Sequence, residues 1–461
     1  MVNLKFKFSY WKNFLEITKL SAPIIIGQIG SVAMGVTDTI MLGKVGKTEL
    51  AAAGIANQIY VLFVVIGMGT LSATAPMIAT SKGAKNKSEC GEILRTGIEL
   101  SFIISVFLCL ILFFLGENFH IFRQPEQVTI MARNYIRIVT VSTIPMMLFI
   151  ALKQFSDGLS ATLPAMVITF VGVFANIFFN WVFIYGNLTF PAMGIEGSAI
   201  ATLFSRIIMA LLLVIYIFNS AKLKEYLPPL ISTFNTWPVL IKIVRVGFPS
   251  GLQLFFEIGA YTGAGVFVGW LGTNELAANQ IVMALSAITY MGASGFSVAG
   301  SIQVGLAFGE SNQKGILTAG NVTIILTALF MLGCCFCFIF YKYPLIHIFS
   351  QDPHVTEVAA TIIVIAGLYQ LSDGLQAVGL GILRGIEDVN IPTVYTLIAY
   401  WVIALPTGYI LGFTFELGIK GIWIGLLIGL SFSAIMLNLR FFHLVLSGKT
   451  KQYVATRLEK V

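Results

Sequence analysis

The sequence predicts an all-α polytopic membrane protein with twelve transmembrane helices, arranged as two pseudo-symmetric six-helix lobes. Three observations predict this fold class. The chain is 57% hydrophobic and only 11% charged, whereas a soluble domain carries about 25% charged residues. Apolar runs of about 20 residues, the length of a helix that crosses the hydrocarbon, recur along all 461 residues. The N-terminal half of the chain also repeats in the C-terminal half.

The repeat is seen when the numbering is shifted by 226 residues. Pro23 then falls on Pro249 and Gly69 on Gly295, and the Glu-Leu-Ala-Ala at 49–52 falls on that at 275–278. Two homologous membrane bundles are typical of a transporter, because a substrate site can form between them and open to each side in turn.

Twelve spans follow from the apolar runs. Six of them belong to an N-lobe at 1–218 and six to a C-lobe at 238–461, which ends in a short cytoplasmic tail. A polar cytoplasmic linker at 219–237 joins the lobes. Since each lobe has an even number of spans, the second enters the membrane from the same side as the first, which makes the repeat a parallel one. The expected spans are 13–39, 50–78, 94–116, 129–151, 163–186, 194–218, 238–270, 276–305, 315–341, 356–381, 392–413 and 418–446.

The basic residues predict the orientation. Most of the 28 Lys and Arg residues lie on loops that share a side with the N-terminus. Such loops face the cytoplasm, so we expect a multi-pass protein of the inner (plasma) membrane with both termini cytoplasmic. The charges are spread over loops rather than gathered on one surface, which argues against a nucleic-acid partner. The Cys and His spacings indicate neither a metal site nor a disulfide framework. We expect no cofactor and a monomer in the lipid bilayer.

Few acidic residues fall inside predicted spans, and three of them stand out: Asp38 in the first, Glu257 in the seventh and Asp373 in the tenth. A charge at the bilayer centre costs roughly 3 kcal/mol on insertion scales, so such residues usually face a cavity and serve function.

Polar neighbours at helical spacing support a cavity. Tyr369 lies four residues before Asp373, and Gln253 four before Glu257, so each pair shares a helix face. Interhelical hydrogen bonding is the alternative use of amide side chains in a membrane. Lys153 with Asp157 at the end of the fourth span, and Arg384 with Glu387 and Asp388 beside the tenth, are expected to be solvated loop groups, and gating is the alternative role for the Arg384 group. The predicted substrate pathway consists of Gln28, Asn176, Asn180, Gln253 and Gln280.

These residues allow ion coupling. Burial in a low-dielectric cavity favours the protonated form of a carboxylate, and carboxylate and phenol oxygens can also hold a hard cation such as Na⁺. The same acids attract a cationic substrate. Competition between ion and substrate for one charge is the simplest basis of antiport.

Three sequence features carry a family resemblance. They are Val-Thr-Asp-Thr-Ile-Met-Leu-Gly at 36–43, Leu-Tyr-Gln-Leu-Ser-Asp-Gly at 368–374 and the joint Gly-x-x-Gly-x-x-Glu-Leu-Ala-Ala in both halves. With Glu257, they resemble the MATE (multidrug and toxic compound extrusion) transporters, NorM-like branch. The resemblance implies a secondary active antiporter that exports small cationic amphipathic drugs in exchange for Na⁺ or H⁺ by rocker-type alternating access.

The resemblance also implies site roles. Glu257, Asp373 and Tyr369 would form a cation (Na⁺) site, and Asp38 would be a further ion-coupling acid. Some relatives carry an acid near Asn180. Because this chain has an Asn there, a proton-binding pair with Asp38 is less favoured, and the C-lobe is the favoured place for ion coupling.

Two alternatives remain at this stage. A lipid-linked oligosaccharide flippase of the same superfamily should have a cationic cavity for its pyrophosphate, whereas the acids predict a negative one. A membrane enzyme or receptor is the other class. The sequence offers no nucleophile–base arrangement or phosphate loop, so we expect no enzyme.

Overall fold

The computed structural model describes residues 2–228 and 236–449. Part of the predicted linker, 229–235, and the end of the predicted tail, 450–461, lie outside the described residues. Within the described ranges every regular element is a helix, and twelve helices are long and apolar enough to cross a membrane. The predicted all-α fold with twelve spans is confirmed.

The helices form two compact units. The N-terminal unit runs from Ile26 to Gly251, and the C-terminal unit joins the chain up to Ile25 with the chain from Leu252 onward. The unit boundaries therefore fall inside two long helices, two residues after Pro23 and Pro249, rather than at the predicted lobe limits of 218 and 238.

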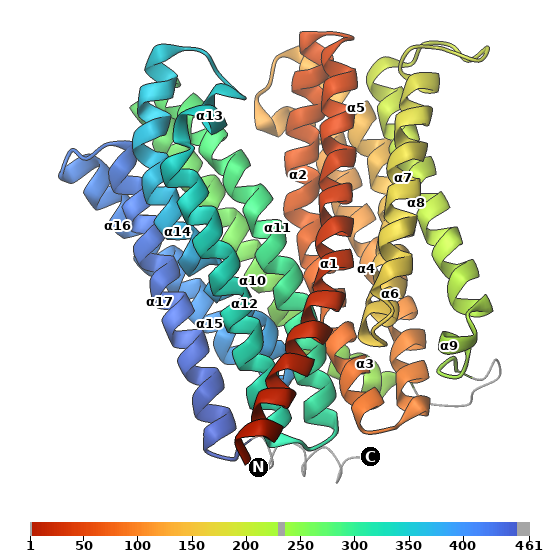
Figure 1. Cartoon of the computed structure of the whole chain (residues 1–461). Coiled ribbons are helices and arrows are strands. Elements are labelled where there is room, and N and C mark those ends of the chain that lie inside the picture. The colour runs from red at the N-terminus through yellow and green to blue at the C-terminus, as the bar shows by residue number, and fades with distance from the viewer. Residues whose placement is uncertain (1, 229–235, 450–461) are drawn as a thin grey trace. The chain divides into compact units, whose positions relative to one another are not determined.

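The N-terminal unit contains the last part of the first helix, from Ile26 onward, and the helices up to the start of the seventh span (Figure 1). Helix α8 packs against α5, α6 and α7, and α4 packs against α6. Its elements are α1 (Val2–Gly43), α2 (Lys47–Ser72), α3 (Thr74–Gly83), α4 (Lys87–Glu117), the 3₁₀ turn η1 (Phe119–Phe122), α5 (Glu126–Val141), α6 (Thr143–Gly158), α7 (Thr162–Phe183), α8 (Gly194–Asn219), the short α9 (Ala221–Lys224) and the first part of α10 (Trp237–Leu271).

The C-terminal unit is built around α14, which packs against α11, α12 and α17. The eleventh span is irregular, because two π-helical segments interrupt it. The elements that follow α10 are α11 (Thr273–Gly309), α12 (Gln313–Phe340), α13 (Lys342–His347), α14 (Pro353–Gly385), α15 (Asn390–Leu397), the π-helix η2 (Ile398–Ala404), α16 (Leu405–Tyr409), the π-helix η3 (Ile410–Thr414) and α17 (Ile419–Leu446).

Two glycines at equivalent positions of the repeat lie in close contact with the first part of α10 and the first part of α1. In the N-terminal unit, a Cβ on Gly69 would lie 2.9 Å from the backbone nitrogen of Gly251. In the C-terminal unit, a Cβ on Gly295 would lie 3.3 Å from the backbone nitrogen of Ile25. Small residues let membrane helices approach this closely. Each unit therefore holds the first part of a helix whose remainder belongs to the other unit.

The repeated Gly-x-x-Glu joint starts a helix in each unit. Gly46 precedes α2 and Gly272 precedes α11, and the glutamate three residues later lies in the first helical turn. The Glu49 carboxyl carbon would be 2.9 Å from a Cβ on Gly46, and that of Glu275 would be 3.4 Å from a Cβ on Gly272. A carboxylate at a helix N-terminus interacts favourably with the helix dipole, so the motif has a structural role.

Candidate functional site

The N-terminal unit brings Asp38, Asn176 and Asn180 together. One carboxylate oxygen of Asp38, on α1, accepts a hydrogen bond of 2.6 Å from the Asn180 amide of α7. The same amide donates to Asn176 at 3.1 Å. The other Asp38 oxygen accepts a hydrogen bond of 3.2 Å from Thr202 of α8, which the sequence reasoning missed. We call these four residues the Asp38 cluster.

Arg206 lies one turn after Thr202 on α8, and its guanidinium makes two short hydrogen bonds. Nη1 donates to the Tyr60 hydroxyl and to Ser142 Oγ, both at 2.6 Å. The guanidinium also lies 5.3 Å from the centre of the Tyr60 ring, which is a cation–π contact. It acts on Asp38 through its charge, without a direct contact. The structure therefore shows a cation held in place by its neighbours.

The C-terminal unit buries both remaining acids. Glu257 of α10 is 6% exposed and Asp373 of α14 is 3% exposed, and the two are close enough to interact through their charges. Asp373 Oδ1 has no hydrogen-bond partner among the described residues. Neither acid forms an ion pair with a Lys or Arg in the described ranges. Buried acids therefore face one another without a neutralising base.

Phenols surround these acids. Tyr369, one turn before Asp373 on α14, is hydrogen-bonded to Tyr261, which in turn lies 3.3 Å from the Tyr400 hydroxyl. Tyr261 is one turn after Glu257 on α10, and its hydroxyl reaches Asp373. Tyr290 of α11 is the hydrogen-bond partner of Glu257. We call the two acids with Tyr261, Tyr290, Tyr369 and Tyr400 the acid–phenol cluster.

The sequence reasoning missed three of the four phenols in this cluster, Tyr261, Tyr290 and Tyr400. Tyr261 follows Glu257 by four residues, so helical spacing alone could have found it. Tyr400 lies in the π-helix η2, where the wider turn breaks the regular 3.6-residue spacing. Its hydroxyl also accepts a hydrogen bond of 2.9 Å from Gln376 of α14.

Of the other predicted pathway residues, Gln253 lies one turn before Glu257 on α10, whereas Gln28 and Gln280 lie on other helices. Gln253 is 2% exposed and braces α10 against the α14–α15 turn, donating to Thr393 Oγ1 at 3.0 Å and to the Val389 carbonyl at 3.3 Å. Gln280 is exposed on α11. Gln28 is half-buried on α1, about 15 Å along the helix from Asp38 at 1.5 Å per residue.

Two charged groups expected in solvated loops lie inside helices. Asp157 of α6 is fully buried and pairs with Lys153 at 2.7 Å. Arg384 lies in the last turn of α14, and its Nη2 is 3.4 Å from Gln253 Oε1. Both expectations were wrong, because α6 and α14 extend further than the apolar runs that predicted them.

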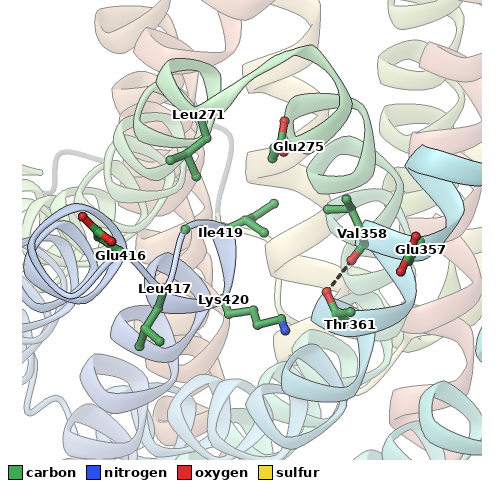
Figure 2. Close-up of a pocket in the computed structure, with 10 residues that line it drawn as sticks. Leu271, Glu275, Glu357, Val358, Thr361, Glu416, Leu417, Ile419 and Lys420 are labelled. Atoms are coloured by element: carbon green, nitrogen blue, oxygen red, sulfur yellow. Dashed lines mark hydrogen bonds between the residues drawn. The ribbon is translucent and has the colours of Figure 1, made fainter.

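A pocket of about 390 Å³ lies elsewhere in the C-terminal unit (Figure 2). It is lined by the end of α10 and the starts of α11, α14 and α17, with Glu275, Glu357, Glu416 and Lys420 around it. Glu357 is sixteen residues before Asp373 on α14, or about 24 Å along the helix. This pocket is therefore distinct from the acid–phenol cluster.

Comparison with known proteins identifies the family. The MatE family model matches residues 23–182 and 249–410, so each match begins at one of the repeat-related prolines. The multidrug resistance protein NorM of Vibrio cholerae serotype O1 is 33% identical over 445 residues, which covers 94% of this chain and 96% of the relative.

The chain belongs to the MATE family.

Other relatives agree with this assignment of the MATE chain. The multidrug resistance protein MdtK of Edwardsiella ictaluri is 32% identical, covering 94% of this chain and 95% of the relative. The crystal structure of the eukaryotic MATE transporter AtDTX14 has a TM-score of 0.88 at 20% identity, covering 98% of this chain and 100% of that one. The predicted family is confirmed, and this MATE chain is a transporter rather than an enzyme.

Proposed function

We propose that this chain is a multidrug efflux antiporter of the inner membrane that exports small cationic amphipathic compounds in exchange for Na⁺. The relatives named multidrug resistance proteins support the export of drugs. The single observation that supports ion coupling is the acid–phenol cluster, where Glu257 and Asp373 are buried together without a base among the described residues.

The oxygen atoms of this cluster suit a small hard cation. Two buried carboxylates that interact cannot both stay ionised unless a cation balances their charge; otherwise one of them takes up a proton. Asp373 Oδ1 is an acceptor left without a partner in the described part of the chain, and the Tyr369 hydroxyl lies one turn away. Carboxylate and hydroxyl oxygens are the ligands that hard cations prefer. Na⁺ would bind Glu257, Asp373 and Tyr369, and H⁺ is the alternative coupling ion.

The Asp38 cluster would be a second ion-responsive site. A carboxylate, two amides and a hydroxyl converge there, and the Asn176 Nδ2 and Asn180 Oδ1 atoms are buried without partners in the described structure. Arg206 adds a fixed positive charge nearby, so this site would hold a cation less tightly than the acid–phenol cluster does.

Alternating access would couple the two fluxes. Ion binding from outside, where Na⁺ is concentrated, would neutralise the acids and so weaken the attraction for a cationic drug. The drug would leave to the outside, and the ion would leave to the cytoplasm.

The proposal includes a monomer with both termini cytoplasmic. The loop before the last span then faces outside, so an impermeant thiol reagent outside cells should label Lys420→Cys.

A lipid-linked oligosaccharide flippase is not favoured. Its anionic pyrophosphate would need cations free of nearby acids, whereas Arg206 is held by Tyr60 and Ser142 and Arg384 lies near the acid–phenol cluster. Both acid clusters would repel such a substrate.

The first prediction concerns coupling. In proteoliposomes that export ethidium under an imposed Na⁺ gradient, Glu257→Gln and Asp373→Asn should each reduce gradient-driven export to the level of protein-free liposomes. The amide keeps the shape but removes the charge that binds the ion. Glu357→Gln, an exposed acid on the same helix as Asp373, is the matched control and should export like the wild type. Full Na⁺-driven export by both cluster variants would refute the assignment.

A further inference from the structure

Arg384, in the last turn of α14, is held far more loosely than Arg206. Arg206 makes two hydrogen bonds of 2.6 Å and a cation–π contact. Arg384 makes one long hydrogen bond of 3.4 Å to Gln253, and its Nε is buried without a partner in the described ranges. No described acidic residue forms an ion pair with it. A half-buried guanidinium with unused donors is an unusual and costly arrangement.

The guanidinium of Arg384 lies beside the acid–phenol cluster. Gln253, which it contacts, is one turn before Glu257 on α10, so the two side chains share a face with Cβ atoms about 5–6 Å apart. Tyr290 is also near both groups, because it is the hydrogen-bond partner of Glu257 and lies close enough to Arg384 to act on it electrostatically. An arginine side chain can cover one helical turn by a change of rotamer.

Glu257 and Arg384 carry opposite charges that could neutralise each other. Glu257 is a buried carboxylate without a base, and Arg384 is a cation without an acid. Leaving either charge buried and uncompensated is strongly unfavourable, and a direct pair would relieve both. While Na⁺ occupies the cluster, the carboxylate is already neutralised, and Arg384 stays on Gln253.

We propose that Arg384 is a positioning residue for ion coupling: it serves as an internal counter-ion that pairs with Glu257 when Na⁺ leaves and must be displaced when Na⁺ binds. This inference rests on the proposed Na⁺ site. Arg384 then competes with Na⁺ for one carboxylate. Competition lowers the apparent Na⁺ affinity by the fraction of molecules in which Glu257 is free, and it assists release of the ion into the cytoplasm.

The test is a Na⁺ titration of the purified full-length protein in detergent, in which the thermal unfolding temperature is measured at each Na⁺ concentration. In the wild type, Na⁺ should raise this temperature with a definite midpoint concentration. Arg384→Gln removes the competitor, so the midpoint should fall on the order of tenfold. Arg384→Lys keeps the charge and should stay within about twofold of the wild type. Lys420→Gln removes a cation elsewhere in the same unit and should not change the midpoint.

The outcomes separate the proposals. An unchanged or higher midpoint in Arg384→Gln would overturn the inference, as would a variant that is equally destabilised at every Na⁺ concentration, which indicates a purely structural arginine. If Arg384→Gln does not fold, Arg384→Met keeps the apolar stem and carries the same expectation. If the wild type shows no Na⁺-dependent shift, the proposed Na⁺ site fails and the inference fails with it.

Discussion

Asp157 and Asp373 are both buried carboxylates, but their partners differ. Asp157 has Lys153 at 2.7 Å on its own helix, whereas Asp373 has hydroxyls and another acid. A buried acid with a fixed base is neutralised permanently and serves the fold. A buried acid without one must take up a proton or a mobile cation. At the scale of single residues, this contrast separates structural charges from coupling charges.

The residue-scale prediction tests that contrast. Lys153→Met leaves the Asp157 carboxylate, whose side chain is 1% exposed, without its base. The free energy of unfolding should fall by about 3 kcal/mol. The double variant Lys153→Met/Asp157→Leu removes both charges and should recover most of this loss. Asp373→Asn, by contrast, should not lower stability. Chemical unfolding in detergent measures all three, and a Lys153→Met variant as stable as the wild type would contradict the structural role of the pair.

Helices α2 and α10 show what small residues do at the scale of whole elements. Gly69, Gly247 and Gly251 bring the two backbones into contact within the N-terminal unit. In the C-terminal unit, Gly295 allows α1 to approach in the same way. Pro23 and Pro249 stand just before the change of unit, and each removes one backbone hydrogen bond from its helix. The repeat therefore reproduces a packing arrangement as well as a sequence.

The element-scale prediction concerns this packing. Gly69→Val places a branched side chain where the Gly251 backbone lies, so α2 and α10 cannot approach, and stability should fall by at least about 2 kcal/mol. Gly54→Val on the same helix is the matched control, because a side chain there meets no atom within 4 Å. The control should stay within about 0.5 kcal/mol of the wild type. Equal thermal stability of the two variants would show that the contact does not support the fold.

Sequence reasoning reached some elements and not others. Hydropathy and the 226-residue repeat predicted all twelve spans, because a span needs little beyond length and apolar composition. The exchange of α1 and α10 between units was not predictable, since it depends on contacts between residues far apart in the chain. The π-helix that carries Tyr400 was hidden for a similar reason: packing against Tyr261 and Gln376, rather than local propensity, gives that tyrosine its partners.

For the whole molecule, the insertion cost of charge was the most useful guide to the site. It selected Asp38, Glu257 and Asp373, and the structure gives each a polar cluster. It misjudged Lys153, Asp157 and Arg384, because composition alone does not show how far a helix continues beyond its apolar run. The MATE fold supplies two such units, and each contains one acid cluster with an arginine near it. Arg206, near the Asp38 cluster, is firmly held by Tyr60 and Ser142, whereas Arg384, near the acid–phenol cluster, makes one long hydrogen bond to Gln253.

The most direct test of ion coupling is drug-stimulated Na⁺ flux in proteoliposomes that contain the wild-type protein, with Na⁺ and pH gradients imposed separately. We predict that adding a cationic drug on one side accelerates movement of labelled Na⁺ in the opposite direction, with no pH gradient present, and that Asp373→Asn abolishes this acceleration. Drug export that proceeds under a pH gradient alone, with no drug-dependent Na⁺ movement, would contradict Na⁺ exchange through the acid–phenol cluster.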